Sequence, residues 1–339
     1  MRLSSAHFVV LLCVSGLTGA AFGQIPCPEL VGQDATITAQ AVTASGSYAY
    51  VGYGADVIVM DVSVPAAPFE VGRVTLPAGQ VRDLAVAGDF LYVAGDTGGL
   101  RIVNVSVPAG PREVGFDDTA EFAWGVDVSG NYAYVADLYD GLRVVDVSTP
   151  TAPFEVGYLF PQSRAHKVVV SGDYAYVAGW SAGLRVINVS VPSTPVLDGF
   201  YDTPGYAYDV AVVGGLAYIA DHGEGLRVID IQNPLSPQEV GFFDTPGSAD
   251  WVDAVGTNAY LVDYHQSLWV VNTVDPTSPS QEGYYDNPGL TEQVALDGGY
   301  AYVADGSSGL EVFLQCPDPL IFADGLESGD TSAWSVTVP

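Results

Sequence analysis

Short stretches in which hydrophobic and polar residues alternate recur along most of the chain. In one such unit they cover residues 125–128, 132–137, 142–147 and 154–159, with Gly, Asn, Asp and Pro between them. Alternation with a period of two is typical of half-buried strands, and the intervening residues are typical of turns. No stretch has a helical period, so the pattern predicts four short antiparallel strands in each unit.

The unit repeats seven times with a constant length. One tyrosine marks the same position in every unit, and successive tyrosines are 42 residues apart: Tyr50, Tyr92, Tyr134, Tyr176, Tyr218, Tyr260 and Tyr302. Four antiparallel strands in a repeat of this length are typical of a propeller blade. The sequence therefore predicts an all-β fold, a seven-bladed β-propeller of four-stranded antiparallel blades.

The last unit lacks its fourth strand. It shows strand patterns at 292–296, 300–305 and 310–315, and then the pattern ends. Near the start of the chain, residues 28–32 read like residues 111–115, which form the fourth strand of another unit. We expect the N-terminal segment to complete the last blade, which closes the ring and removes two exposed strand edges.

Two cysteines frame this junction. Cys316 takes the position of Ser148 at the end of a third strand, and Cys27 takes the position of Ala152 at the start of a fourth strand. Only three residues separate these positions in an intact unit, so the spacing favours a disulfide between Cys27 and Cys316.

The ends of the chain differ from the repeats. Arg2, an apolar run and the small residues Ala21 and Gly23 before Gln24 indicate a signal peptide over residues 1–23. The propeller is expected over 24–316 and a flexible, polar C-terminal tail over 317–339. We therefore expect a secreted protein, located outside the cell, at the cell surface or in the periplasm, with no membrane insertion.

Charge narrows the classes of partner. The chain has 10 Lys and Arg against 40 Asp and Glu, a formal net charge of −30. Phosphate binding needs clustered cations, so this balance argues against nucleic acid and anionic membranes as partners. An extracellular carbohydrate, peptide or protein ligand remains, and we expect a monomer with no cofactor.

The repeats also resemble a known family. Residues 183–190, Gly-Leu-Arg-Val-Ile-Asn-Val-Ser, and residues 225–231, Gly-Leu-Arg-Val-Ile-Asp-Ile, are similar to the LVIVD repeat. The likeness runs through all seven units, over residues 27–316. It implies a propeller-type fold in an exported bacterial or archaeal protein. It implies no activity and no ligand.

A binding site is expected where the units differ on a shared face. Ten residues before each tyrosine the inner strand begins, and the residues there are all different, whereas two positions later every unit has Val or Leu. The candidate ligand-binding residues are Arg82, Trp124, His166, Tyr208, Asp250, Glu292 and the adjacent Trp251. Such variation is typical of a specific pocket on a repeated scaffold, and equally of a solvated rim that drifts.

Catalysis and metal binding stay open as alternatives to a binding and adhesion function. His166, His222 and His265 map to the same face and are weak candidates for a metal site, although exposed loop histidines explain them as well. A secreted hydrolase or lyase could use His166 with Asp250 or Glu292, either alone or with the assistance of a metal ion. No nucleophile elbow, zinc-protease motif or phosphate-binding loop is present, so the sequence favours binding over catalysis.

Overall fold

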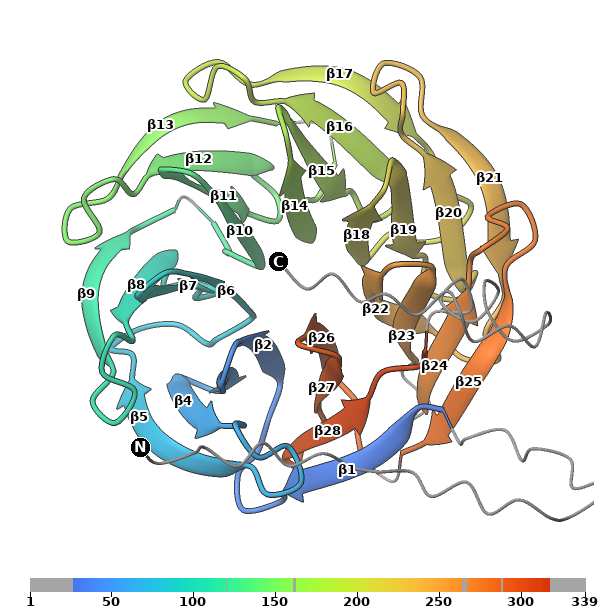
Figure 1. Ribbon diagram of the computed structural model, residues 1–339. Helices are drawn as coiled ribbons and strands as arrows, with labels where there is room; N and C mark the ends of the chain where they lie inside the picture. The colour runs from blue at the N-terminus through green and yellow to red at the C-terminus, as the bar shows by residue number, and fades with distance from the viewer. Residues whose placement is uncertain (1–26, 120, 161–162, 264–266, 288, 318–339) are drawn as a thin grey trace, which may run out of the picture.

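The computed structural model describes residues 27–119, 121–160, 163–263, 267–287 and 289–317. The predicted signal peptide, and the predicted tail except for its first residue, lie outside these ranges. Within them the chain forms 28 strands in seven four-stranded antiparallel sheets around a central axis (Figure 1). The predicted seven-bladed propeller is thereby confirmed. The same ranges contain no helix that could cross a membrane.

Each blade runs from an inner strand beside the axis to an outer strand at the rim. Blade 1 comprises β2(Ala41–Ser45), β3(Tyr48–Tyr53), β4(Asp56–Asp61) and β5(Phe69–Thr75). Blade 2 comprises β6(Asp83–Ala87), β7(Phe90–Ala94), β8(Leu100–Asn104) and β9(Arg112–Asp117). Blade 3 comprises β10(Gly125–Ser129), β11(Tyr132–Ala136), β12(Leu142–Asp146) and β13(Phe154–Leu159). Blades 4 and 5 comprise β14(Lys167–Ser171), β15(Tyr174–Ala178), β16(Leu184–Asn188), β17(Val196–Tyr201); β18(Asp209–Val213), β19(Leu216–Ala220), β20(Leu226–Asp230) and β21(Gln238–Phe243). Blades 6 and 7 comprise β22(Ala249–Val255), β23(Asn258–Asp263), β24(Ser267–Asn272), β25(Ser280–Asp286); β26(Gln293–Asp297), β27(Tyr300–Ala304), β28(Leu310–Leu314) and β1(Glu29–Asp34).

The hydrophobic core lies between the blades rather than at the axis. Seven separate clusters of buried side chains each combine one face of a blade with the facing side of its neighbour. The repeated tyrosine belongs to these clusters; Tyr134 is 4% exposed and Tyr260 is fully buried. The 42-residue spacing therefore reports packing between blades, which every unit must repeat to bury its apolar faces.

Ring closure takes the predicted form. Strand β1 pairs with β28 in antiparallel register, Glu29 opposite Leu314 and Asp34 opposite Leu310, so the first and last strands share blade 7 (Figure 1). The predicted Cys27–Cys316 disulfide is also confirmed, with 5.3 Å between the two Cα atoms. The bond links the ends of two strands that are 289 residues apart in sequence.

The repeated glycine of the outer strand permits a close approach between blades. A Cβ atom on Gly115 would overlap the carbonyl oxygen of Pro150, which belongs to the turn of the next blade. At Gly283 the oxygen is that of Cys27, so the N-terminal segment replaces the proline turn there. The outer-strand glycine and the proline turn of the next blade thus form one contact that recurs around the ring.

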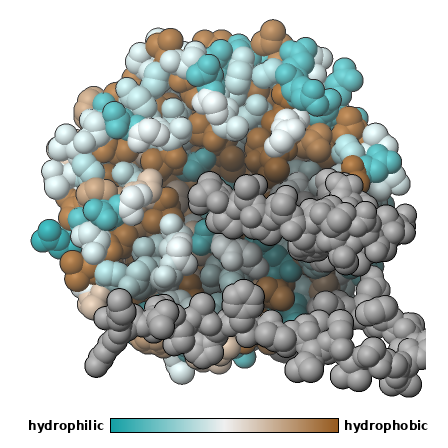
Figure 2. Space-filling view, viewed as in Figure 1, coloured by the Kyte–Doolittle hydropathy of each residue, from teal (hydrophilic) through white to brown (hydrophobic). Residues whose placement is uncertain are grey.

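Four exposed aromatic rings of the outer strands have an arginine partner in their own blade. Four repeated arginines lie over them at 4.7 to 5.0 Å from the ring centre, in the pairs Arg101–Phe116, Arg143–Tyr158, Arg185–Phe200 and Arg227–Phe242. The arginine stems and guanidinium groups cover apolar surface that would otherwise face water. Apolar and polar side chains are accordingly interspersed over the face seen down the axis (Figure 2).

Candidate functional site

The variable residues lie at one end of the propeller, which we call the top face. It carries the residues that precede the inner strands and the hairpins between the second and third strands of the blades. Backbone hydrogen bonds join the two: the amide of His222 donates to the carbonyl of Ala249 in the next blade at 2.9 Å, and the amide of Ala249 donates back at the same distance. Each candidate residue that follows such a bridge is therefore fixed between two blades.

The hairpin residue of this bridge has a left-handed backbone. Its φ is positive in every described blade that forms the turn in this way: 54° at Asp96, 31° at Leu138, 51° at Trp180 and 51° at His222. Blades 1 and 7 have Gly54 and Gly306 at the equivalent position. Glycine adopts this conformation freely, whereas other residues do so at a cost of about 1 kcal/mol or more. Four blades therefore keep a side chain on the top face in spite of local strain.

Six of the seven predicted residues line one pocket on the top face. It has a volume of about 160 Å³ and is lined by Gln40, Val81, Arg82, Trp124, Tyr208, Asp250, Trp251 and Glu292. These residues come from blades 1, 2, 3, 5, 6 and 7, so the arrangement exists only in the closed ring. Variation between repeats was the signal that located them.

An aromatic path leads from this pocket across the adjacent blades. The guanidinium of Arg82 lies 4.5 Å from the ring centre of Trp124 and pairs with Asp96 at 3.0 Å. His166 contacts Trp124 at 5.7 Å and Tyr208 at 5.0 Å between ring centres. His222 stacks on Tyr208 with 5.0 Å between the ring centres.

His166, the seventh predicted residue, lies behind the pocket and not in it. The side chain is 7% exposed, and neither ring nitrogen has a hydrogen-bond partner in the described part of the chain. Burial, together with the positive charge of Arg164, lowers the pKa of His166 to about 4. The imidazole is therefore neutral at physiological pH and makes no contact with Asp250 or Glu292 of the kind that acid–base catalysis would need.

The histidine that does meet a carboxylate is His222. Its Nδ1 lies 2.8 Å from Oδ1 of Asp250, and its side chain is 37% exposed. Burial raises the pKa of Asp250, while the hydrogen bond with His222 opposes that shift. This pair was not foreseen, because the residues are 28 positions apart and belong to different blades.

Glu292 is the second carboxylate of the pocket. Burial raises its pKa, and the negative charges of Asp250 and Asp305 add to the effect, while Arg82 opposes it. No described group donates a hydrogen bond to this carboxylate. Glu292 is therefore a half-buried acid available to a ligand.

The described residues contain no preformed metal site. Nowhere in those ranges do three or more His, Cys, Asp or Glu side chains converge as a metal ion requires. His166 and His222 each contact Tyr208, and His265 lies outside the described residues.

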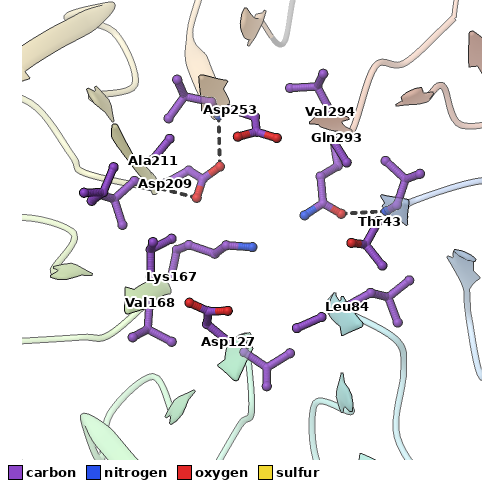
Figure 3. A pocket seen from close by; sticks show the side chains of 18 of the residues that line it. Thr43, Leu84, Asp127, Lys167, Val168, Asp209, Ala211, Asp253, Gln293 and Val294 are labelled. Atoms are coloured by element: carbon purple, nitrogen blue, oxygen red, sulfur yellow. Dashed lines mark hydrogen bonds between the residues drawn. The ribbon is translucent and has the colours of Figure 1, made fainter. Parts of the chain in front are cut away.

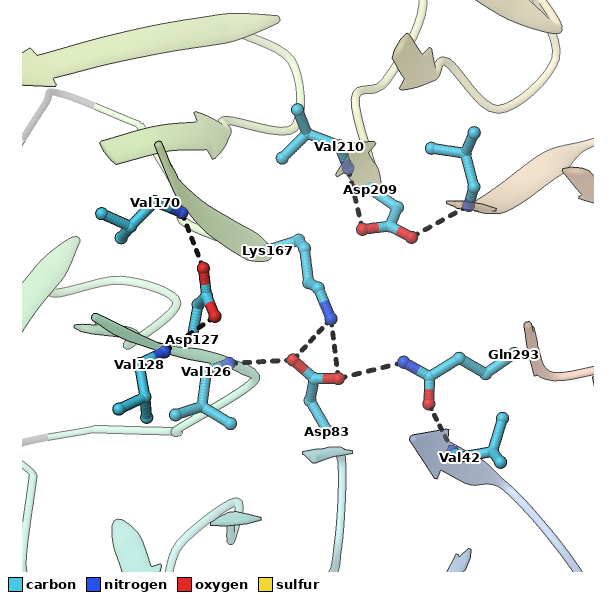
Figure 4. A network of polar contacts seen from close by, with 11 residues as sticks. Val42, Asp83, Val126, Asp127, Val128, Lys167, Val170, Asp209, Val210 and Gln293 are labelled. Carbon is cyan, nitrogen blue, oxygen red and sulfur yellow. Dashed lines mark hydrogen bonds and ion pairs between the residues drawn. The ribbon is translucent and has the colours of Figure 1, made fainter. Parts of the chain in front are cut away.

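Below the top face, the axis of the propeller is a polar channel. It has a volume of about 350 Å³, and Lys167, Asp127, Asp209, Asp253 and Gln293 project into it from five inner strands (Figure 3). The ammonium of Lys167 lies 2.7 Å from both carboxylate oxygens of Asp83, which is fully buried (Figure 4). Blades 2 and 4 are thus joined across the channel by an ion pair.

The channel acids also join adjacent blades. Each accepts a hydrogen bond from a backbone amide of the next inner strand: Asp83 from Val126 at 2.9 Å, Asp127 from Val170 at 2.7 Å, Asp209 from Val252 at 2.9 Å and Asp253 from Leu296 at 2.8 Å. Gln293 performs this role between blades 7 and 1 by accepting from Val42 at 2.7 Å, and it donates to Asp83 at 3.0 Å (Figure 4). These side chains therefore hold the inner strands in their ring.

This network predicts that stability falls between pH 5 and pH 8. Burial raises the pKa of Asp209 to about 7 and that of Asp253 to about 6, against about 3.9 for an unfolded Asp. The folded state binds these protons more tightly, so their contribution is complete below pH 4 and is lost as the pH rises through 6 and 7. We expect Asp209 alone to account for about 3 kcal/mol of this loss, because its folded pKa lies about two units above pH 5.

Chemical denaturation at several pH values measures the effect. Asp209→Asn should flatten the dependence between pH 5 and 8, whereas Asp173→Asn, at an exposed turn on the opposite end of blade 4, should leave it unchanged. An equal slope in the wild type and Asp209→Asn would contradict the prediction.

Solved structures confirm the architecture without indicating an activity. The β-propeller domain of Cps50 (Swd1) from Myceliophteria thermophila is similar with a TM-score of 0.71 and 11% identity, over 85% of this chain and all of that one. Sqt1 from Saccharomyces cerevisiae has a TM-score of 0.64 and 9% identity, over 86% and 99%. BamB from Moraxella catarrhalis has a TM-score of 0.55 and 12% identity, over 82% of each chain.

The search of curated proteins gave no match. At such low identities the solved structures are evidence of the fold alone. Relationship by sequence comes from the repeats themselves. The profile of the LVIVD repeat matches residues 38–76, 78–119, 122–159, 163–203, 204–245, 246–287 and 288–313, so this chain belongs to the LVIVD repeat family.

Proposed function

We propose that the protein is an exported binding module that holds an extracellular ligand in the top-face pocket. One observation carries the proposal. The residues that differ between repeats, among them Trp124, Tyr208, Trp251 and Glu292, line a single cavity. Repeated framework residues pack between blades, so only the variable set needs another explanation.

The chemistry of the lining supports a binding role. Two indole rings and a phenol give flat apolar surfaces, and two carboxylates give hydrogen-bond acceptors in the same cavity. Such a combination of an apolar wall with a few polar groups is typical of specific ligand sites. The Cys27–Cys316 disulfide is consistent with an oxidising, extracellular setting.

Removal of the two indole rings is expected to abolish binding. We predict that Trp124→Ala combined with Trp251→Ala lowers the affinity for the ligand by about 100-fold or more, because each buried aromatic contact contributes on the order of 2 kcal/mol. Glycan and peptide arrays probed with the full-length protein identify the ligand, and calorimetry measures its affinity. Thermal unfolding should show that the double variant is folded. Undiminished binding by a folded double variant would exclude this pocket as the site.

The His222–Asp250 pair favours a second candidate function, acid–base catalysis in a hydrolase or lyase. A carboxylate on Nδ1 fixes the imidazole tautomer and leaves Nε2 to exchange a proton with a substrate. Turnover of any substrate in a panel of polysaccharides and esters, lost in His222→Ala, would favour this function over simple binding. A panel without turnover would leave the pair as a structural contact.

A further inference from the structure

The size of the top-face pocket limits what enters it. Its volume of about 160 Å³ is close to that of an engineered cavity of about 150 Å³ that binds benzene. Pockets for drug-sized molecules measure about 300 Å³ or more. The cavity therefore encloses about one side chain, one small head group or one ring of a larger ligand.

Charge distinguishes the head groups that fit. The cavity holds one guanidinium, that of Arg82, which Asp96 already pairs at 3.0 Å. Its two carboxylates are Asp250, which meets His222, and Glu292, to which no described group donates a hydrogen bond. In this partly desolvated site Arg82 offsets the charge of Glu292 only in part, and a cationic ligand would compensate it further than a neutral one.

The raised pKa of Glu292 agrees with this reading. Burial is the main cause, and the repulsion from Asp250 and Asp305 is the next, so the negative charge is held at an energetic disadvantage. A bound cation relieves both effects, because it replaces lost hydration and screens the neighbouring acids.

The aromatic walls suit a cation equally well. The electron-rich face of an indole attracts ammonium and guanidinium groups within about 6 Å of the ring centre. The chain itself makes this contact in the wall of the pocket, where Arg82 lies 4.5 Å from the ring centre of Trp124, and again outside it, where Arg164 lies 3.6 Å from the ring centre of Trp180. Trp251, with the ammonium of Lys167 5.8 Å from its ring centre, lines the same cavity and is a further ring that takes part in such a contact.

The rest of the protein provides few cations to occupy the site. Of the nine Lys and Arg side chains in the described residues, seven form ion pairs with acids of the same chain. The net charge of −30 attracts basic partners over a distance and accelerates their association.

From these observations we infer that the top-face pocket binds an organic cation, the ammonium or guanidinium group of a lysine or arginine side chain on a peptide or protein, between Trp124, Trp251 and Glu292. This inference rests on the proposed function and specifies the class of ligand. The carboxylate of Glu292 accepts hydrogen bonds from the cation, and the indole rings contact its apolar stem and charged end.

Calorimetric and saturation-transfer titrations of the full-length protein test the inference. The probes are N-acetyl-arginine amide and N-acetyl-lysine amide, with N-acetyl-norleucine amide as the neutral analogue and cellohexaose as a neutral glycan. Single charges avoid the non-specific attraction of a polybasic peptide to an acidic protein. We expect at least one cationic probe to bind and the norleucine probe to bind at least about tenfold more weakly, because the charged contact is lost.

Matched variants separate the site from general electrostatics. Glu292→Gln keeps the shape of the side chain and should lower the affinity for the cationic probe at least about tenfold. Asp173→Asn removes the same charge at the opposite end of the propeller and should change this affinity less than twofold. Equal binding to the wild type and Glu292→Gln, or no binding of either cation, would overturn the inference. Binding of cellohexaose or an array ligand, lost in Trp124→Ala with Trp251→Ala, would then leave the proposed function standing. If none of the probes and no array ligand binds, both the inference and the proposed function are refuted.

Discussion

Loss of the Cys27–Cys316 disulfide is expected to lower the free energy of unfolding by about 4–5 kcal/mol. The bond closes a loop of nearly the whole propeller, since its cysteines are 289 residues apart. In the chain-entropy account, a cross-link stabilises the protein by restricting the unfolded chain, and its effect grows slowly with loop length to about 4.7 kcal/mol at 100 residues. A value near the top of the usual range is therefore expected here.

Denaturant unfolding of Cys27→Ala with Cys316→Ala measures this effect. The reduced wild type should unfold at the same denaturant concentration as the variant and at a lower concentration than the oxidised protein. This comparison controls for the packing lost at Cys316, a residue that is 6% exposed. Strand β1 should detach first, because only its pairing with β28 then holds the two ends together. A difference below about 1 kcal/mol between oxidised and reduced protein would show that strand pairing alone closes the ring.

The fold could be predicted because each blade repeats the same packing problem. Tyr134 and its six counterparts must fill equivalent spaces between blades, so the spacing in the sequence directly reports the architecture. Strand bounds agreed to within a residue or two; the third unit was predicted at 132–137 and 142–147, and the structure has Tyr132–Ala136 and Leu142–Asp146. The split blade followed from the same comparison, because its missing strand had a readable counterpart at the N-terminus.

The top-face pocket could be located but not detailed. Position within the repeat was enough to bring Arg82, Trp124, Tyr208, Asp250 and Glu292 to one end of the ring. Which side chains meet there depends on rotamers and on the left-handed hairpin residues, and the repeat pattern carries neither. His222 rather than His166 therefore contacts Asp250, although both histidines occupy the same face.

The channel network shows the same limit more clearly. Asp83, Lys167 and Asp209 directly follow the candidate residues Arg82, His166 and Tyr208 in the sequence, so the repeat pattern alone would place them at the mouth of the channel. They lie inside it, and Asp83 is 0% exposed and Asp209 3% exposed. Lys167 and Asp83 are 84 residues apart and meet across the axis, a contact that depends on the diameter of the closed ring. A pattern within one blade contains no information on that distance.

Replacement of Lys167 by methionine is expected to lower the free energy of unfolding by about 3–5 kcal/mol at pH 7.5. Methionine keeps most of the volume and removes the ammonium that faces Asp83, Asp127 and Asp209 in the channel. Asp83 would then be a fully buried carboxylate without its charged partner, and breaking one side of a buried ion pair costs about this much. Asp209 and Asp127, whose acidity Lys167 also favours, would lose the same compensating charge.

Three comparisons test whether the loss is electrostatic. Lys167→Met with Asp83→Asn should recover part of the stability, because the second change removes the orphaned charge, and the double-mutant cycle gives the coupling energy. Arg73→Met breaks two surface ion pairs, with Asp56 and Glu70, in which the arginine is 39% exposed, so it should cost no more than about 1 kcal/mol. The deficit of Lys167→Met should shrink as the pH falls to 5, because burial raises the pKa of Asp209 to about 7 and that of Asp253 to about 6, so these two acids then bind protons and need less compensation. A deficit that is independent of pH and of Asp83→Asn would mean that Lys167 acts through packing rather than through its charge.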